Sequence, residues 1–374
     1  MQHRHPDSVQ RVSSFQQDAM RRDFTINALG IDKNGMIYDY VDGIQDLKNK
    51  LLRAVGDAKN RFTEDALRIY RVLRFASKLG FTVEPKTLEA AKELVDITDT
   101  LAAERVTGEM YKVAASGSAL SRYIQHLDSV GLLKKSLPEI KQLQGKEQHV
   151  KHHPEGDVYQ HTLAALNVSP SNDPIVNISI LLHDIGKGIT YMNRGTPDTP
   201  KHTYYGHDVA GLSIIDRIAD RFKLSSKDKD IIKFVAQRHM LLHHPEELSR
   251  QKIVQIVNSP YWDTLKIASY ADKASRGEGF DEQRYNTDIA YMEKIAKETS
   301  AGGGPEGLKK RLKSMVDGNR LIAWIPELNQ ADNRPLIGQL IHKLQEWIIN
   351  SNRFDLKEDD VKRLALKFYN EMLT

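Results

Sequence analysis

Histidines and aspartates in the middle third of the chain have the residue types and the spacing of a metal site. In sequence order, the set consists of His161, the adjacent pair His183 and Asp184, His207, His239 and Asp272. Neutral imidazole and carboxylate groups hold divalent ions without sulfur ligands. A bound divalent ion polarises a phosphoryl oxygen and lowers the pKa of a bound water molecule. The set therefore predicts metal-dependent cleavage of phosphate esters.

Lys187 follows His183 by four residues in the segment HDIGK. On one helix, that spacing places two side chains on the same face. The ammonium group of Lys187 would then neutralise a phosphate held by the metal, and Gly186 would leave room for close approach. We therefore expect His183, Asp184 and Lys187 to carry the hydrolytic chemistry.

Each of these residues has a simpler explanation when it is taken alone. A histidine on a helix usually lies at the surface or is hydrogen-bonded in the core, and an adjacent His-Asp pair arises by chance in many proteins. The ordered set, rather than any one pair, favours a metal site.

Composition restricts the chemistry further. The 374-residue chain has no cysteine, which excludes disulfides, thiolate ligands and cysteine nucleophiles and favours a reducing compartment. No apolar run approaches the roughly 20 residues that span a bilayer, and the polar start lacks the apolar stretch of a signal peptide. We expect a cytoplasmic protein with no membrane partner. The net charge of +4 is too small for non-specific coating of nucleic acid, although local arginine clusters could bind phosphates.

The elements that position these residues are predicted to be mostly α-helical. The one clear sheet element is a hairpin at 24–41, where two β-prone runs flank the turn Lys33-Asn34-Gly35. A single helix is predicted next within the segment 61–81, with Thr63 as its cap and Gly80 at its end. Beyond it, apolar residues recur at three-to-four spacing in LEAAKELVDI, GEMYKVAAS, SALSRYIQHLDSVGLL and much of 158–299.

Two stretches read as linkers, 145–157 and the glycine-dense 300–307. They predict a partial sheet domain at 1–45, a helical neck and body at 46–145, an all-helical metal domain at 146–299 and a helical tail at 308–374. In the tail, apolar residues at helical spacing predict a core stripe, which consists of Leu336, Ile337, Leu340, Ile341, Leu344 and Trp347.

The ordered metal-site set resembles the HD phosphohydrolase superfamily. Its pattern of a histidine, an adjacent His-Asp and a distant aspartate is matched by His161, His183-Asp184 and Asp272. The resemblance implies that these residues bind a divalent ion such as Mg²⁺, Mn²⁺ or Ni²⁺. Two alternatives stay open for His207 and His239, which match further histidines of some members: ligands of a second ion, or ordinary helix histidines.

The amino-terminal motifs are more specific. RRDFTINALGID, MIYDYVDGIQDLKNKLLRAVGDAKNRFTEDALRIYRVLRFASKLGF and LAAERVTGEMYKV resemble the bacterial-type (class II) CCA-adding tRNA nucleotidyltransferases and their poly(A) polymerase relatives. With the HD segment, the resemblance covers about 15 to 280 and follows the order of multifunctional members. It implies a remnant of a nucleotidyltransferase palm in the hairpin, tRNA as partner, and CTP and ATP as substrates. It also implies hydrolysis of 2′,3′-cyclic phosphates and 2′-phosphomonoesters by the HD domain.

The resemblance assigns the reading of CTP and ATP to Asp65 and Arg68. Cytosine and adenine both offer an amino donor beside a ring-nitrogen acceptor, and a carboxylate beside a guanidinium complements that edge. The family also implies ribose and triphosphate contacts by Arg22, Asp23 and Asn27, and a basic face extended by Arg71 and Arg74. The competing explanation is a set of ordinary helix ion pairs, such as Glu64 with Arg68.

The chain also departs from that family. Nucleotidyl transfer needs carboxylates that hold two Mg²⁺ ions, and the family supplies them from a Gly-Gly-x-Val-Arg-Asp loop and an Asp-x-Asp pair ahead of RRDFTIN. The roughly twenty residues there contain only Asp7 and Asp18 and neither motif. We expect the catalytic head to be absent, because it is a separate polypeptide, because the sequence is truncated, or because polymerisation has been lost.

Two rival functions stay open at this point. One is a free-standing HD-type nucleotide phosphohydrolase in which the neck is a relic. The other is a non-catalytic RNA-binding subunit whose histidine cluster never holds a metal.

Overall fold

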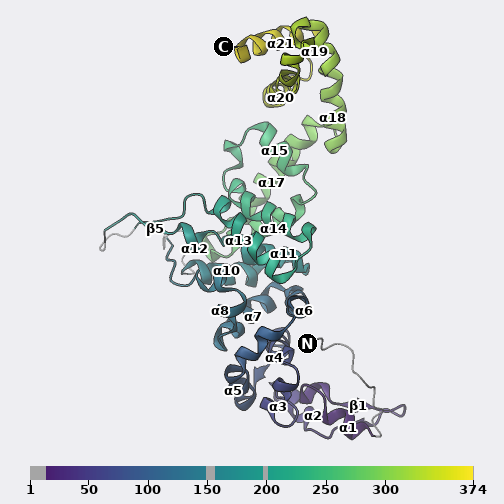
Figure 1. Ribbon diagram of the computed structural model, residues 1–374, viewed down its shortest axis with the longest axis vertical. Helices are drawn as coiled ribbons and strands as arrows, with labels where there is room; N and C mark the ends of the chain where they lie inside the picture. The colour runs from purple at the N-terminus through teal and green to yellow at the C-terminus, as the bar shows by residue number, and fades with distance from the viewer. Residues whose placement is uncertain (1–13, 149–155, 197–200, 374) are drawn as a thin grey trace. The chain divides into compact units, whose positions relative to one another are not determined.

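The computed structural model describes residues 14–148, 156–196 and 201–373 (Figure 1). The predicted dominance of α-helix is confirmed throughout these ranges. The chain divides into two compact units: the first holds Met1–Arg238 and Ile267–Phe280, and the second holds His239–Lys266 and Asp281–Thr374. Asp7 and most of the predicted linker at 145–157 lie outside the described residues. Among the described helices, none is long and apolar enough to cross a membrane.

Helices dominate the first unit. Those before the metal-site histidines are α1 (Phe15–Met20), η1 (Thr25–Asn27), α2 (Gly43–Lys48), α3 (Ala58–Glu64), α4 (Leu67–Leu79), α5 (Pro85–Glu93), η2 (Val95–Thr100), α6 (Ala103–Ala114), α7 (Gly117–Ser129), α8 (Leu132–Ser136) and α9 (Pro138–Lys141). Those around the histidines are α10 (Val158–Val168), α11 (Pro174–Leu182), α12 (Lys187–Thr190), α13 (His207–Phe222), α14 (Ser226–Arg238), the later residues of α16 (Trp262–Ala274) and η5 (Gly277–Gly279).

Strands in the first unit are short and form two-stranded pairs. The predicted hairpin is confirmed as β1 (Gly30–Ile31) and β2 (Ile37–Tyr38), antiparallel, with Gly35 at φ +83° in the turn. It is shorter than expected, because residues 25–27 form the 3₁₀ helix η1 instead of continuing a strand. Two pairs went unpredicted: parallel β3 (Leu51–Leu52) with β4 (Thr82–Val83), and antiparallel β5 (Met192–Asn193) with β6 (His202–Thr203). Two-residue strands carry too little alternation to be read from sequence.

The prediction of one continuous helix between Thr63 and Gly80 is wrong. The chain forms α3 and α4 with a break at Asp65, whose extended backbone lets its side chain accept a hydrogen bond from the Leu67 amide. Thr63 is no cap: its hydroxyl donates to the Lys59 carbonyl inside α3. The predicted end holds, since Gly80 adopts φ +66° as the C-cap of α4.

Apolar packing places the end of α11 in the interior of the first unit. Every residue of α11 from Val176 to Leu182 is buried, and the helix packs against α6, α10 and α14. Gly117 lets α7 approach α10, because a Cβ there would lie 2.2 Å from the Leu166 carbonyl oxygen. A helix buried on all sides delivers whatever follows it into the core, and His183 follows α11.

The second unit is helical in the described residues. Its elements are η3 (His239–Leu242), η4 (Pro245–Glu247), α15 (Arg250–Val257), the start of α16, α17 (Glu282–Thr299), α18 (Gly304–Met315), α19 (Gly318–Trp324), η6 (Pro326–Asn329), η7 (Ala331–Asn333), α20 (Arg334–Ser351) and α21 (Glu358–Leu373). The predicted core stripe is confirmed in α20, where Leu340 and Leu344 are fully buried and the other four pack around them. The predicted linker at 300–307 is shorter than expected, because α18 begins at Gly304, with Pro305 in its first turn.

A buried ion pair joins α4 to α6 in the first unit. The Glu109 carboxylate accepts hydrogen bonds from Arg74 and, at 2.7 Å, from Lys112. Burial raises the pKa of Glu109, but Lys112 and Arg74 outweigh it, so the pKa lies below its ordinary 4.5. A carboxylate with a depressed pKa stabilises the fold above its unfolded-state pKa, and that stability is lost as the pH falls through the folded-state pKa.

Glu109→Gln is expected to lower the free energy of unfolding at pH 7 by about 3–5 kcal/mol, because it leaves the buried Arg74 guanidinium uncompensated. The variant should also lose less stability than the wild type as the pH falls below 4.5. Urea unfolding at several pH values measures both effects. Glu104→Gln, at an exposed position of the same helix, is the control. Equal stability of Glu109→Gln and wild type at pH 7 would contradict this account.

Candidate metal centre

Helix ends and helix faces of the first unit bring five of the predicted metal-site residues together. His161 lies in α10, His183 is the C-cap of α11, Asp184 follows in a turn, and His207 opens α13. Asp272 comes from the part of α16 that belongs to the same unit. All five side chains are buried, with residue exposures of 0 to 8%.

Nε2 atoms and carboxylate oxygens converge at this point. His161 Nε2 lies 3.1 Å from Asp272 Oδ1 and 3.7 Å from Asp184 Oδ2. His183 Nε2 lies 3.3 Å from Asp184 Oδ2 and 3.9 Å from Asp272 Oδ1. On the other side of the same carboxylate, His207 Nε2 lies 3.3 Å from Asp184 Oδ1. Asp184 is therefore the central residue of the cluster.

Hydrogen bonds fix the ring orientation of all three histidines. His183 Nδ1 lies 2.7 Å from the Ile180 carbonyl oxygen, and His207 Nδ1 lies 2.9 Å from that of Tyr204. A carbonyl can only accept, so both Nδ1 atoms carry the proton. His161 Nδ1 lies 3.1 Å from Ser275 Oγ, whose own proton goes to the Asp272 carbonyl at 2.6 Å. With Nδ1 carrying the proton, each ring can present the lone pair of Nε2 to a cation at the centre of the cluster.

This donor set fits a divalent cation. The ligand atoms offered by His161, His183 and Asp184 lie within 4.8 Å of one another. Nitrogen and oxygen donors at such spacing suit Zn²⁺, Mn²⁺, Ni²⁺ or Fe²⁺, and outer hydrogen bonds of the kind seen here accompany metal-bound histidines. The geometry agrees with the predicted ligands, while metal binding itself stays a prediction.

Lys187 contacts the cluster, but from the first residue of a new helix and not from the helical face that the sequence predicted. It does not share a helical face with His183, because α11 ends at Leu182 and Lys187 begins α12 after a turn. The turn brings Lys187 Nζ to 2.7 Å from Asp184 Oδ2 and to 2.9 Å from Gln148 Oε1. Burial raises the pKa of Asp184, but Lys187, His183 and His207 outweigh it and hold the pKa well below its usual range. Asp184 is thus a carboxylate anion.

Gly186 allows a close approach of α13 to the turn that carries Asp184. A Cβ at Gly186 would lie 2.0 Å from the His207 carbonyl oxygen and 2.8 Å from the Gly211 amide nitrogen. Any side chain there would push α13 away, and His207 with it. The glycine therefore sets the distance between the turn of Asp184 and the first residue of α13.

His239 is buried in η3, directly after the last residue of α14. It is the first residue of the second unit. The five-residue cluster described above is built without it. Its assignment as a ligand of a second ion stays a prediction.

Most of the predicted nucleotide-binding residues gather near α1 and α4. Asp23 Oδ2 accepts from Arg71 at 2.6 and 2.9 Å, and its Oδ1 faces Asn27 Nδ2 at 3.4 Å. Arg22 donates to the Asn27 carbonyl at 3.0 Å. Arg22 and Arg68 also line one open pocket of about 650 Å³, together with Asp18, Arg21, Arg61 and Glu64. A pocket of that size can hold a nucleotide.

The sequence predicted Asp65 and Arg68 one turn apart on a continuous helix, and this prediction is wrong. The break between α3 and α4 separates them, and each has another partner. Both Asp65 oxygens accept from Arg105, at 3.0 and 2.9 Å, while Arg68 donates to Glu64 at 2.6 Å. The predicted alternative of a Glu64–Arg68 helix ion pair is present in this structure.

Arg74 does not extend the basic face. It is buried, with 7% exposure, and pairs with Glu109. Its guanidinium lies 3.9 Å from the centroid of the Phe75 ring. Arg74 therefore supports the packing of α4 on α6 instead of facing a phosphate.

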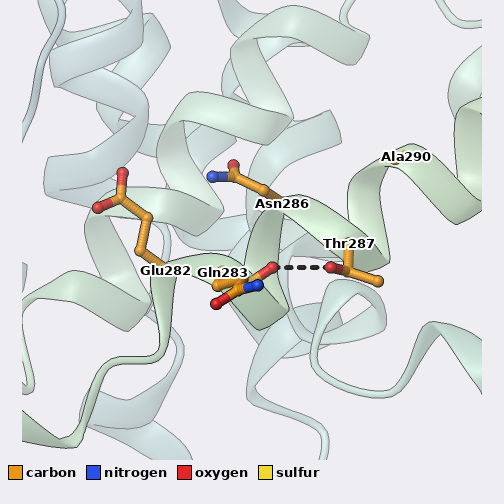
Figure 2. A pocket seen from close by; sticks show the side chains of 5 residues that line it. All are labelled: Glu282, Gln283, Asn286, Thr287 and Ala290. Carbon is orange, nitrogen blue, oxygen red and sulfur yellow. Dashed lines mark hydrogen bonds between the residues drawn. The ribbon is translucent and has the colours of Figure 1, made fainter.

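A second pocket lies along α17 in the other unit. Figure 2 shows its lining side chains, in which Thr287 donates a hydrogen bond to the Gln283 carbonyl at 2.9 Å. The lining consists of Glu282, Gln283, Asn286, Thr287 and Ala290. One carboxylate among amides and a hydroxyl offers neither a metal site nor a catalytic pair.

The family models that match the chain divide it into parts of a poly(A) polymerase and an HD domain. Residues 1–53 match the model of the Poly A polymerase head domain, and residues 80–143 match that of the probable RNA and SrmB-binding site of polymerase A. Residues 158–276 match the HD domain.

Curated relatives place the chain more narrowly. It is 36% identical over 257 residues to the multifunctional CCA protein of Pasteurella multocida, covering 66% of this chain and 59% of that one. It is 32% identical over 306 residues to that of Vibrio vulnificus, covering 77% of this chain and 72% of that one. The chain belongs to the multifunctional CCA protein family, and it spans about three-fifths to seven-tenths of the length of these relatives.

A solved structure supports the fold. The chain resembles the Bacillus stearothermophilus CCA-adding enzyme in complex with CTP, with a TM-score of 0.68 and 20% identity over 96% of this chain and 76% of that one.

Sequence reasoning missed two positioning residues of the cluster. Ser275 binds His161 and the backbone of Asp272, and Gln148 accepts from Lys187. Ser275 lies three residues after Asp272 in ADKAS, directly after the last residue of α16, so a spacing of about one helical turn was the available signal. Gln148 lies far from Lys187 in sequence, and no signal of that kind existed for it.

Ser275→Ala is expected to weaken Mn²⁺ binding by roughly 10- to 100-fold, because the His161 ring loses the group that fixes its tautomer. Isothermal titration of the purified chain with Mn²⁺ measures this. Ser275→Thr keeps the hydroxyl and should restore affinity, and the exposed Ser213→Ala is the control. Wild-type affinity in Ser275→Ala would show that the serine only fills space.

Proposed function

We propose that this chain processes the 3′ end of tRNA, and that its HD domain hydrolyses phosphate esters there in a metal-dependent reaction. The substrates would be 2′,3′-cyclic phosphates and 2′-phosphomonoesters, through phosphodiesterase, 2′-nucleotidase and phosphatase activity. The observation that carries the proposal is the convergence of three Nε2 atoms on the buried carboxylates of Asp184 and Asp272. Family membership supports the choice of tRNA as partner.

The residues of the cluster have distinct roles in this proposal. His161, His183, Asp184 and Asp272 hold the ion, which when bound would polarise a phosphoryl oxygen and activate water. His207 faces the other oxygen of Asp184 and is placed to share the negative charge there. Lys187, now paired with Asp184, can turn its ammonium group to a substrate phosphate. Burial of the cluster strengthens each of these interactions by excluding water.

The nucleotide-reading part of the proposal rests on the neck. Asp65 and Arg68 would recognise CTP and ATP, and Arg22, Asp23, Asn27 and Arg71 would hold the ribose and triphosphate. Arg71 and Arg22 already lie beside Asp23 and Asn27. For Asp65 and Arg68 to meet a base, their present bonds to Arg105 and Glu64 must open. The match of residues 1–53 to a head-domain model gives no support to a head supplied as a separate polypeptide, and the proposal includes none.

His183→Ala is expected to abolish release of phosphomonoester from 2′,3′-cAMP in the presence of Mg²⁺, Mn²⁺ or Ni²⁺. The loss of rate should exceed the roughly 100-fold loss that follows substitution of a residue hydrogen-bonded to a metal ligand. Product formation is followed by chromatography. His342→Ala, at an exposed histidine of α20, should hydrolyse at the wild-type rate. Full activity in His183→Ala, or activity that resists chelation of the metal, would contradict the assignment.

The 374-residue chain is expected not to add CMP or AMP to tRNA that lacks its end, because Gly-Gly-x-Val-Arg-Asp and Asp-x-Asp are not found ahead of RRDFTIN. It should still bind that tRNA. Radiolabel incorporation and a filter-binding assay test both statements. Incorporation by this chain would show that other carboxylates hold the ions. Hydrolysis of nucleotides without any tRNA affinity would favour a free-standing HD-type nucleotide phosphohydrolase.

A further inference from the structure

The β5–β6 hairpin follows α12 in the chain and lies beside it in Figure 1. The side chains on its two faces differ in character. Its register pairs Met192 with Thr203 and Asn193 with His202, and the Arg194 amide donates to the Lys201 carbonyl at 2.9 Å, which extends the pairing by one step. Alternate residues of a strand point to opposite faces, and cross-strand partners share a face.

The inner face of the hairpin is tied to the metal centre. The Tyr191 and His202 rings stack with centroids 5.6 Å apart, and the Tyr204 ring lies 5.7 Å from that of Tyr191. The Tyr204 carbonyl accepts from His207 Nδ1, and Lys187 Nζ lies 5.4 Å from the centroid of the Tyr204 ring. The hairpin is therefore fixed in place by residues of the cluster.

The outer face combines cations with an exposed aromatic ring. Arg194 and Lys201 are exposed and oppose each other across the strands. Like charges in directly opposed positions are destabilising, so an anion between them would stabilise the pair. Tyr205 is 74% exposed, and the Arg194 guanidinium lies 5.3 Å from the centroid of its ring.

We propose that this outer face binds the single-stranded 3′ end of an RNA substrate, with a base stacked on Tyr205 and a backbone phosphate held by Arg194 and Lys201. Aromatic rings among cations bind single-stranded nucleic acid because every base has a face that can stack. Tyr205 lies two residues from His207, at most about 7 Å along an extended chain. A strand held there would therefore lie close to the metal centre. The inference rests on the proposed function, whose substrate class it makes more specific.

The test is binding of a fluorescein-labelled RNA hexamer with a 2′,3′-cyclic phosphate end, followed by anisotropy without metal. Tyr205→Ala should weaken binding roughly tenfold, and Tyr205→Phe should not. Arg194→Ala and Lys201→Ala should each reduce the slope of log affinity against log salt by about 0.7. The matched control is Tyr291→Ala, at an exposed tyrosine of the other unit, which should bind like the wild type.

Wild-type affinity and salt slope in Tyr205→Ala and Arg194→Ala would overturn the inference, as would failure of the wild type to bind the hexamer. A duplex of the same sequence should bind more weakly, because its bases already stack on one another. Equal binding of the duplex would show that the surface recognises only the charge of the phosphates, and it would also overturn the inference. Hydrolysis of 2′,3′-cAMP by the wild type, measured in parallel, reports the proposed function by itself, so the two failures are distinguishable.

Discussion

Asp184 carries a negative charge into the interior of the first unit, and the surrounding helices are arranged to compensate it. A buried carboxylate is stable only where cations and hydrogen-bond donors surround it. The Lys187 ammonium group, at the start of α12, does so here at 2.7 Å, and the Nε2 atoms of three imidazole rings, from α10, the end of α11 and the start of α13, lie around the same carboxylate. All of these elements therefore meet at one carboxylate. Gly186 allows the close contact between the Asp184 turn and α13.

Helix ends position side chains of both predicted sites in the first unit. The break between α11 and α12 frees Asp184 and Lys187 to face each other, and the break between α3 and α4 frees Asp65 to meet Arg105. A continuous helix would direct these side chains along its own faces. A helix that ends beside such a residue lets its side chain contact distant segments, while the buried residues of α4 and α11 anchor the two helices in the core.

Sequence reasoning succeeded where residue type and order carry the information. The order of His161, His183-Asp184 and Asp272 indicated residues that the fold does bring together, and the apolar spacing of α20 predicted its buried stripe. It failed where distant residues decide local structure. EDALR has helical spacing, yet Asp65 leaves the helix to meet Arg105, 40 residues away. HDIGK also reads as helix, yet its turn is fixed by close contact of Gly186 with α13. Burial of Arg74 depends likewise on Glu109 in another helix.

The most direct test of the central claim is anomalous diffraction from crystals of this chain grown with Mn²⁺. We predict a strong peak within bonding distance, about 2.0–2.3 Å, of His161 Nε2, His183 Nε2 and a carboxylate oxygen each of Asp184 and Asp272. A crystal in which these side chains keep their places and Mn²⁺ binds elsewhere, or nowhere, would contradict the account.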